Sequence, residues 1–408
     1  MRTVYLKGRF RGGPFHSLYK ELTEFPPQGY CYISDLMKSS KSKQPSQPLS
    51  RIQRMIRQID GKMRSNNSVW SIWNEAKTMS YLLVKEYRDS KFKNLPEARA
   101  SLIYCSQQLL FAKLPWIVDV EYANSLVGGN EIRVVRRAVQ HCLASKYCKK
   151  VLPWSDWSEK TLYRSMDCSS FKNKIETVHF AIRPKKVIQK KASDNTRLLF
   201  VGSTNLENAL NFERKGGVET IESFLELRKK YDKLDLVVRS WVPREIKAKY
   251  SGIPGLKILD SPLSNEGLRQ LYVSSDIFLF PSHLNLGMGI LEAMSYELPV
   301  IARRVFDIPE AVEDMKTGLL LEPLKNLPYY LWNGAPNVFD REFLLGIRRY
   351  RARFIEQIVE KTSVLIENTS LTKKLGRQAR TTIEEGKFSI ENRNAKLKRI
   401  FDEVLRTN

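Results

Sequence analysis

Two glycine-containing turns in the second half of the sequence have residue types suited to a phosphate ligand. An apolar run ends at Gly202, and Lys215-Gly216-Gly217 opens a stretch with helical periodicity. Glycines let a backbone approach a ligand closely, and a lysine beside a helix N-terminus offers positive charge to an anion. The lysine motif is short, and an ordinary structural turn explains it equally well.

The second turn, between residues 280 and 292, combines glycines with a carboxylate. An expected strand ends at residues 280–282, a loop with two glycines follows, and Glu292 lies in the first turn of the next expected helix. The backbone amides of Gly287, Met288 and Gly289 are suited to a diphosphate or to sugar hydroxyls, and the Glu292 carboxylate to a ribose diol. The alternative is that Glu292 only complements the helix dipole.

Two further carboxylates follow an apolar run in the first half. Along the expected strand 116–122, alternation places Asp119 and Glu121 on the same face. Buried acids without partners are unfavourable, so they are either solvated, paired with Arg133 or Arg136, or part of a binding surface. In the last case they bind substrate hydroxyls or assist proton transfer.

The hydrophobic pattern predicts the elements that position these residues. From residue 198 onward, short apolar runs alternate with helical stretches, as expected for a parallel sheet that binds ligands at the carboxyl ends of its strands. The expected strands are residues 198–201, 234–239, 257–259, 277–280 and 299–302. The expected helices are residues 217–231, 265–274, 289–296 and the chain from about 341 onward.

The first half follows the same α/β scheme. A strand at 3–6, a glycine-containing turn and a helix at 14–24 open the chain, and buried strands are expected at 101–104, at 116–120 and finally at 175–178. Residues 183–196 are polar, basic and aperiodic, which predicts a linker between two domains. A chain of 408 residues with 42% hydrophobic side chains is too long for one ordinary core and too apolar for disorder.

The charge of the chain is uneven. The net charge is +24, of which +19 falls in residues 1–195 and +5 in the remainder. The basic half is expected to attract an anion such as a phosphorylated substrate, an acidic membrane surface or nucleic acid. Residues 51–64 predict a basic amphipathic helix, either a membrane-binding element or a solvated helix packed by its apolar stripe.

Cysteine usage and hydropathy indicate a cytoplasmic protein. The five cysteines lack metal-ligand spacing and are expected to be reduced, structural thiols. No apolar run is as long as a membrane span, and the start of the sequence has no signal-peptide core.

The second half resembles the retaining glycosyltransferases of family four (glycosyl transferases group 1). The matching pieces are FVGS, RKGG, LSNEGLRQLYVSSDIFLFPS, LGMGILEAMSYELPVIA and IPEAVEDMKTGLLLEP, in family order over residues 198–323. The final stretch, over about 373–405, resembles the closing helices of these enzymes. Over residues 1–190 the likeness is limited to the Gly12-Gly13 loop and the run CKKVLPWSDWSEKTL.

The resemblance implies an α/β protein with the GT-B fold, in which two Rossmann-like domains face each other across a cleft. It implies an acceptor domain at 1–190, a nucleotide-sugar domain at 191–385, and a C-terminal helix at 386–408 that returns to the first domain. Lys215 is expected to neutralise the donor diphosphate, and Glu292 to hold the ribose. The remaining family positions lie against the donor sugar and phosphates: Gly12, Gly13, Gly287, Met288 and Gly289.

This chain departs from the family pattern at the donor sugar. The family has a second glutamate eight residues before Glu292, where this sequence has Leu284. Leucine cannot accept a hydrogen bond, so His283 or Asn285 substitutes, or the sugar is held differently.

Two other family positions also differ. Ser203 stands where the family often has an arginine, and Arg214 is a candidate for the missing charge. Glu121 stands where the family often has a histidine.

The resemblance predicts transfer of a sugar from a nucleotide-diphosphate donor to an acceptor hydroxyl with retention of configuration. Asp119, Glu121, Lys215 and Glu292 are the expected catalytic residues, and no metal is expected because no Asp-x-Asp motif is assignable. The basic first half favours a lipid-linked or otherwise anionic acceptor, and a protein that lies at the inner membrane face. The alternative is a GT-B binding or scaffold protein with little transfer activity; a nucleic-acid partner is disfavoured because no such motif is present.

Overall fold

The computed structural model describes residues 1–8, 17–34, 67–90, 100–185, 194–204, 209–338 and 340–406. The chain forms two compact units. The first contains Met1–Phe180, Asn333–Ala335 and Arg393–Asn408, and the second contains Ala181–Trp332 and Pro336–Asn392. Gly12, Gly13 and the basic segment 51–64 lie outside the described residues.

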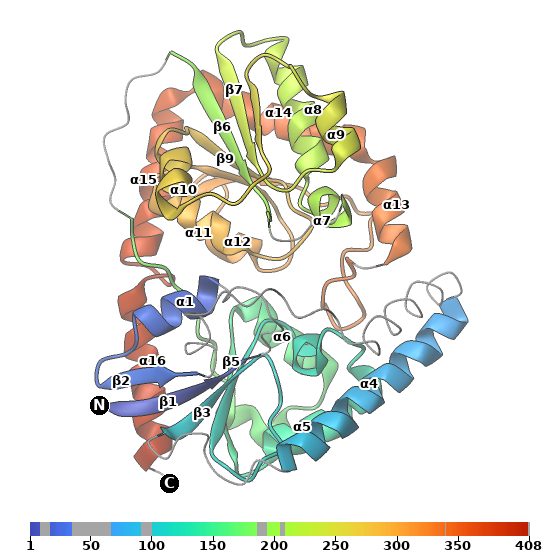
Figure 1. Ribbon diagram of the computed structural model, residues 1–408, viewed down its shortest axis with the longest axis vertical. Helices are drawn as coiled ribbons and strands as arrows, with labels where there is room; N and C mark the ends of the chain where they lie inside the picture. The colour runs from blue at the N-terminus through green and yellow to red at the C-terminus, as the bar shows by residue number, and fades with distance from the viewer. Residues whose placement is uncertain are drawn as a thin grey trace. The chain divides into compact units, whose positions relative to one another are not determined.

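The first unit contains a parallel sheet in the order β2-β1-β3-β4-β5 (Figure 1). Its strands are mostly apolar and largely buried, as expected for a parallel sheet that is covered on both faces. They are β1 (Arg2–Lys7), β2 (Tyr30–Ile33), β3 (Ala100–Ser106), β4 (Trp116–Val120) and β5 (Cys148–Pro153).

The helices of the first unit include one from the far end of the chain. Those from the N-terminal part are α1 (Ser17–Glu24), α4 (Asn67–Ser90), α5 (Arg136–Ala144) and α6 (Asp156–Ser165). Short 3-10 helices join them: η1 (Ala123–Val127), η2 (Arg133–Val135) and η3 (Ser169–Lys174).

Helix α16 (Ile390–Arg406) completes the first unit, as the GT-B resemblance implies. The Phe401 ring packs edge-on against Tyr30 with ring centroids 5.1 Å apart, and the Tyr30 hydroxyl donates to Asp402 Oδ1 at 2.6 Å. A short internal segment also belongs to this unit, because the buried Asn333 amide donates to Asn124 Oδ1 at 2.7 Å and to Ser165 Oγ at 2.8 Å.

The second unit contains a parallel sheet in the order β11-β10-β9-β6-β7-β8. This order reverses direction at β6, so the ends of β6 and β9 lie at a topological switch point where α/β proteins bind ligands. The strands are β6 (Thr196–Val201), β7 (Leu234–Arg239), β8 (Leu256–Leu259), β9 (Ile277–Phe280), β10 (Val300–Arg303) and β11 (Gly318–Leu321).

Helices cover this second sheet, and α14 packs beside α8 (Figure 1). The helices between strands are α7 (Ala209–Arg214), α8 (Gly217–Arg228), α9 (Arg244–Lys249), α10 (Asn265–Val273), α11 (Met288–Ser295) and α12 (Ile308–Ala311). After β11 come α13 (Arg341–Arg349), α14 (Arg351–Glu367) and α15 (Thr369–Glu384).

The expected strands of the second half are present, with β7 and β9 matching at both ends. The expected strand at 175–178 is wrong, because that segment contributes only a single parallel bridge, from Ile175 to Val151. The short strands β2 and β11 carried no separate sequence signal. Among the described helices, none is both long and apolar enough to cross a bilayer.

The five cysteines are free, which agrees with the expectation of structural thiols. All but Cys31 are buried, and burial raises the pKa of the Cys105 and Cys142 thiols to about 12. A thiol with such a pKa stays protonated and acts as a small apolar side chain.

We expect Phe401→Ala to destabilise the first unit by about 3 to 4 kcal/mol, because it removes a fully buried ring that packs on Tyr30. Urea unfolding monitored by circular dichroism measures this loss. Glu391→Ala, at an exposed position of the same helix, is the control and should have little effect. Equal stability of the two variants would mean that α16 does not pack on the first sheet.

Candidate functional site

The lysine turn and the loop after β9 are held together in the second unit. Gly216 has a φ of +76°, and a Cβ built there would lie 2.7 Å from the carbonyl oxygen of Pro281. The backbone N–H of His283 donates to the Arg214 carbonyl at 2.8 Å. The motif at Lys215 is therefore more than a solvent-exposed turn, because its glycine permits a backbone contact with the end of β9.

Lys215 lies half-buried in the turn between α7 and α8. Within the part of the chain that the structure describes, its ammonium group makes no ion pair and no side-chain hydrogen bond. Burial lowers the pKa of Lys215 from its usual value, and the positive charge of Arg239 lowers it further. The lysine is thus a partly desolvated cation beside a second cation.

Glu292 is the fifth residue of α11, so the expectation that it lies in the first helical turn is wrong. The helix begins at Met288, directly after Gly287. The Glu292 carboxylate is half-buried and accepts a hydrogen bond from the Tyr272 hydroxyl at 2.9 Å. Because the dipole effect fades beyond the first turn, complementing the helix dipole does not explain this glutamate.

Arg239 interacts electrostatically with both Lys215 and Glu292. Its Nη1 donates to the Gly202 carbonyl at 3.3 Å, and its own carbonyl accepts from the Gly202 N–H at 2.8 Å. Burial lowers the pKa of Arg239, whereas Tyr272 and Glu292 act in the opposite direction. We call Lys215, Arg239, Tyr272 and Glu292 the strand-end cluster, since it gathers around the carboxyl ends of β6 and β7.

The other expected donor-binding residues of the second unit fall into two groups. The half-buried group consists of Ser203, Asn285, Gly287 and Gly289. Met288 is buried, and the Arg214 side chain is only 7% exposed.

His283 is placed in an aromatic core rather than on an accessible surface. The side chain is fully buried, its ring contacts Phe354 and Phe343 edge-on, and its Nδ1 lies 3.1 Å from the Tyr329 hydroxyl. Burial and the nearby Arg303 lower the pKa of His283 well below its usual value. As a neutral core residue, His283 is poorly suited to replace the glutamate missing at Leu284.

Two further charged residues of the second unit, Arg303 and Glu219, are fully buried. Arg303, at the end of β10, is fully buried, with its guanidinium carbon 4.1 Å from the centre of the Phe354 ring. Glu219 in α8 is fully buried and forms a long ion pair with Arg351, at 3.8 Å. Burial raises the pKa of Glu219 to about 7.

Glu213 connects α7, which precedes the lysine turn, to α13 and α14. Its carboxylate accepts two hydrogen bonds from Arg348, at 2.8 and 2.9 Å, and one from Arg351 at 3.0 Å. Bidentate pairing fixes the orientation of a carboxylate better than a single contact. The chain after residue 340 therefore helps to position the lysine turn.

In the first unit, Asp119 is an internal hydrogen-bond acceptor at the end of β4. It is 1% exposed and accepts from the Tyr19 hydroxyl at 2.9 Å, from the Gln107 N–H at 2.8 Å and from the Tyr104 hydroxyl at 3.3 Å. Burial raises the pKa of Asp119 to about 7, although these hydrogen bonds oppose the shift. Its partners are these groups, not Arg133 or Arg136.

Glu121 does not share the setting of Asp119. The strand β4 ends at Val120, so alternation along the strand no longer fixes the direction of Glu121. Glu121 is half-buried, and its backbone carbonyl accepts a hydrogen bond from Ser158 at 2.5 Å.

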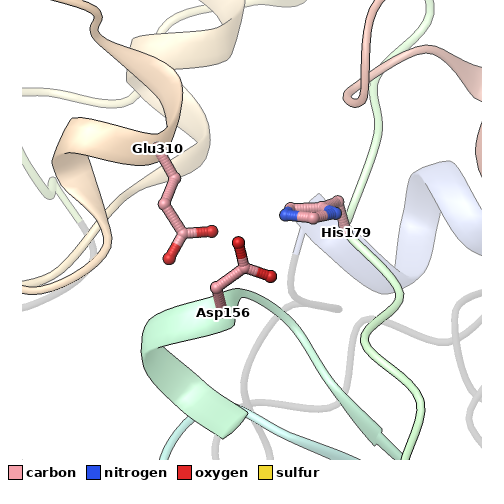
Figure 2. A group of neighbouring side chains, drawn as sticks. All are labelled: Asp156, His179 and Glu310. Atoms are coloured by element: carbon pink, nitrogen blue, oxygen red, sulfur yellow. The ribbon is translucent and has the colours of Figure 1, made fainter. Parts of the chain in front are cut away.

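Three potential metal ligands among the described residues are divided between the two units. Figure 2 shows Asp156 at the start of α6, His179 in the extended chain after η3, and Glu310 in α12. Asp156 and His179 belong to the first unit and Glu310 to the second. Two ligands in one unit do not make a metal centre, so neither unit taken alone supplies one from this group.

The sequence analysis missed two members of the strand-end cluster. Arg239 ends a predicted strand, but an arginine at a strand end is usually solvated and gives no distinctive signal. Tyr272 lies on the apolar side of α10 and resembles any packing residue. Only the hydrogen bond from its hydroxyl to Glu292 connects Tyr272 with the candidate site.

Solved structures similar over the whole length identify the class of fold. HepE of Anabaena, solved in complex with UDP and glucose, has a TM-score of 0.60 at 12% identity, covering 99% of this chain and 100% of that one. Sucrose-phosphate synthase of Thermosynechococcus elongatus has a TM-score of 0.60 at 14% identity, covering 100% of both chains. The protein therefore has the GT-B fold of glycosyltransferases.

The sequence comparisons each cover part of the chain. Residues 195–327 match the family model described as glycosyl transferases group 1. Sulfoquinovosyl transferase SQD2 of Arabidopsis thaliana is 36% identical over 83 residues, which are 19% of this chain and only 16% of that protein. Residues 195–327 thus match glycosyl transferases group 1, as the motifs over residues 198–323 indicate.

We expect Gly216→Ala to destabilise the second unit more than Gly252→Ala does. Both glycines have a φ of +76°, but a Cβ at Gly252 meets nothing within 4 Å, whereas one at Gly216 meets Pro281. The control therefore measures the backbone strain alone, about 1 kcal/mol, and the difference measures the clash. Urea unfolding of both variants gives the two values, and equal values would contradict the contact with Pro281.

We expect Glu219→Gln to make stability less dependent on pH. The folded-state pKa of about 7 lies above the usual value of 4.5, so the stability that this group contributes is present at low pH and is lost as the pH rises toward 7. From pH 5 to pH 8, the free energy of unfolding of the variant should rise relative to wild type by about 1 to 3 kcal/mol. Urea titrations at both pH values measure this.

The matched control for Glu219→Gln is Glu226→Gln, at an exposed position of the same helix. Its stability relative to wild type should not change between the two pH values. The buried carboxyl would be refuted as the origin of the effect if both variants behaved alike.

Proposed function

We propose that this protein is a glycosyltransferase that moves a sugar from a nucleotide-diphosphate donor to an acceptor hydroxyl, with retention of anomeric configuration. The observation that carries the proposal is the strand-end cluster, in which the charge of Arg239 acts on Lys215 and the charge of Glu292 acts on Arg239. The GT-B fold and the match over residues 195–327 support the same class of reaction. Retention rests on the family resemblance.

In this proposal the second unit stabilises the departing diphosphate. Negative charge develops on that group as the glycosidic bond breaks, and a preorganised cation lowers the barrier. Lys215 supplies the cation, the amides of Gly287, Met288 and Gly289 face the phosphates and sugar, and Glu292 accepts from the ribose. A divalent metal is not required for this charge stabilisation.

For the first unit we propose different roles for the two carboxylates. Asp119 is a positioning residue, because its hydrogen bonds fix α1 and the end of β3. Glu121 remains a candidate for contact with substrate hydroxyls. Gly12 and Gly13 are proposed to approach the donor phosphates.

We propose that the acceptor is anionic, for example lipid-linked, and that the protein works at a membrane surface. The support is the net charge of +19 in residues 1–195. Basic side chains near an acidic bilayer contribute about 1 kcal/mol each. Flotation with neutral and acidic liposomes tests this: binding that ignores acidic lipid would refute the membrane part of the proposal.

A second candidate is a nucleotide-sugar-binding protein without turnover, favoured by Leu284 in place of the family's first glutamate. The two functions are separated by calorimetry with UDP, GDP and ADP, followed by an assay of donor-sugar hydrolysis and transfer. Binding together with turnover supports the enzyme. Binding without turnover of any nucleotide sugar supports the scaffold.

We expect Lys215→Ala and Glu292→Ala each to lower kcat at least about tenfold, since each removes a charged contact with the donor. Lys229→Ala, on the exposed end of α8, is the control and should retain wild-type kcat. Steady-state kinetics with the donor identified by calorimetry measures the effect. Rates near wild type in both site variants would refute the site.

A further inference from the structure

We propose that Arg239 is a second donor-binding cation, which contacts the diphosphate together with Lys215. This inference rests on the proposed function and adds a residue to its site. Neither the family motifs nor the sequence analysis assigned Arg239, and Arg214 was the expected source of the second charge.

The first argument is the charge balance around Arg239. Lys215 and Arg239 are like charges, both are partly removed from water, and the charge of Arg239 lowers the pKa of Lys215. Among the residues that the structure describes, neither forms an ion pair with a carboxylate. Glu292 is the one carboxylate of the described residues that acts electrostatically on Arg239, and it does so without an ion pair. One carboxylate does not balance two neighbouring, partly desolvated cations, which are therefore stabilised further when an anion binds between them.

The second argument is the placement of the guanidinium group. Arg239 exchanges hydrogen bonds with Gly202, through its carbonyl at 2.8 Å and its Nη1 at 3.3 Å. The next residue, Ser203, accepts from the N–H of Trp241 at 2.9 Å, so the ends of β6 and β7 interlock. These contacts hold the arginine against the carboxyl end of β6, one of the two strands that border the topological switch point.

The third argument compares Arg239 with Arg303, the arginine at the end of β10. Arg303 is fully buried and lies over the Phe354 ring, as expected for an arginine that packs in the core. Arg239 is only half-buried and has no such aromatic contact among the described residues. Both arginines have enclosed donors without a hydrogen bond, Nε in Arg239 and Nε and Nη1 in Arg303, so the difference between them is that Arg239 is partly exposed. A guanidinium with unused donors suits a phosphate, which it binds through several N–H groups at once.

The test is isothermal calorimetry of the full chain with inorganic pyrophosphate, with UDP, GDP and ADP, and with the matching nucleosides. The variants are Arg239→Gln and Arg239→Lys. The matched control is Arg244→Gln, which removes the same charge at an exposed position five residues further on. Thermal denaturation of each variant checks that the fold is retained.

We expect Arg239→Gln to weaken pyrophosphate and nucleoside diphosphate binding at least about tenfold, since one charge-assisted contact is lost. Arg239→Lys should restore part of the affinity, and Arg244→Gln should match wild type. Nucleoside binding should be unchanged in all variants, because a nucleoside lacks the diphosphate.

Three outcomes would refute either the proposed function or the assignment of Arg239. Wild-type protein that binds none of the nucleoside diphosphates refutes the proposed function itself. Wild-type binding that Arg239→Gln and Arg244→Gln weaken equally refutes the assignment of Arg239. If Arg239→Gln loses nucleoside affinity as much as diphosphate affinity, Arg239 has a structural role and its assignment as a donor-binding cation is refuted. If Arg239→Gln fails to fold, the same comparison is made with Arg239→Lys.

Discussion

The close approach of Gly216 to Pro281 determines the geometry of the second unit's site. Any side chain at position 216 would meet the carbonyl of Pro281, and the positive φ already favours glycine there. Because the turn lies against the end of β9, Lys215 is withdrawn from water and lies within electrostatic reach of Arg239. The backbone hydrogen bond from His283 to Arg214 also holds the lysine turn against the segment that follows β9. A single backbone contact therefore places a cation where a flexible surface lysine would otherwise be.

Buried charged residues also hold the helices next to the lysine turn in place. Glu213 is held by Arg348 and Arg351, and the latter also faces Glu219. Such networks contribute little net stability, because desolvation offsets much of the attraction, but they allow few alternative arrangements. The corresponding element of the first unit is Asp119, whose three donors come from α1, from β3 and from the loop after β3. In both units a buried carboxylate fixes backbone close to the proposed donor and acceptor surfaces.

The sequence was sufficient to predict the alternating elements and the GT-B class, and it singled out Lys215 and Glu292 as candidate donor-binding residues. Local periodicity and turn chemistry carry that information. It could not predict that Tyr272 would donate to Glu292, nor that Arg239 would neighbour Lys215, since both contacts join residues far apart in sequence. The same limit applies to Asp119: the need for partners was foreseeable, but their identity depended on strand order. His283 was misjudged because a histidine beside a glycine loop gives no sign of the aromatic rings that enclose it.

The return of Arg393–Asn408 to the first unit has a consequence for the order of folding during synthesis. A ribosome releases the N-terminal strands long before it makes the helix whose Phe401 covers Tyr30. The nascent first unit therefore stays incomplete, with apolar surface exposed, until more than two hundred further residues have been synthesised. A premature stop codon before Phe401 would consequently damage the part of the molecule that was translated first.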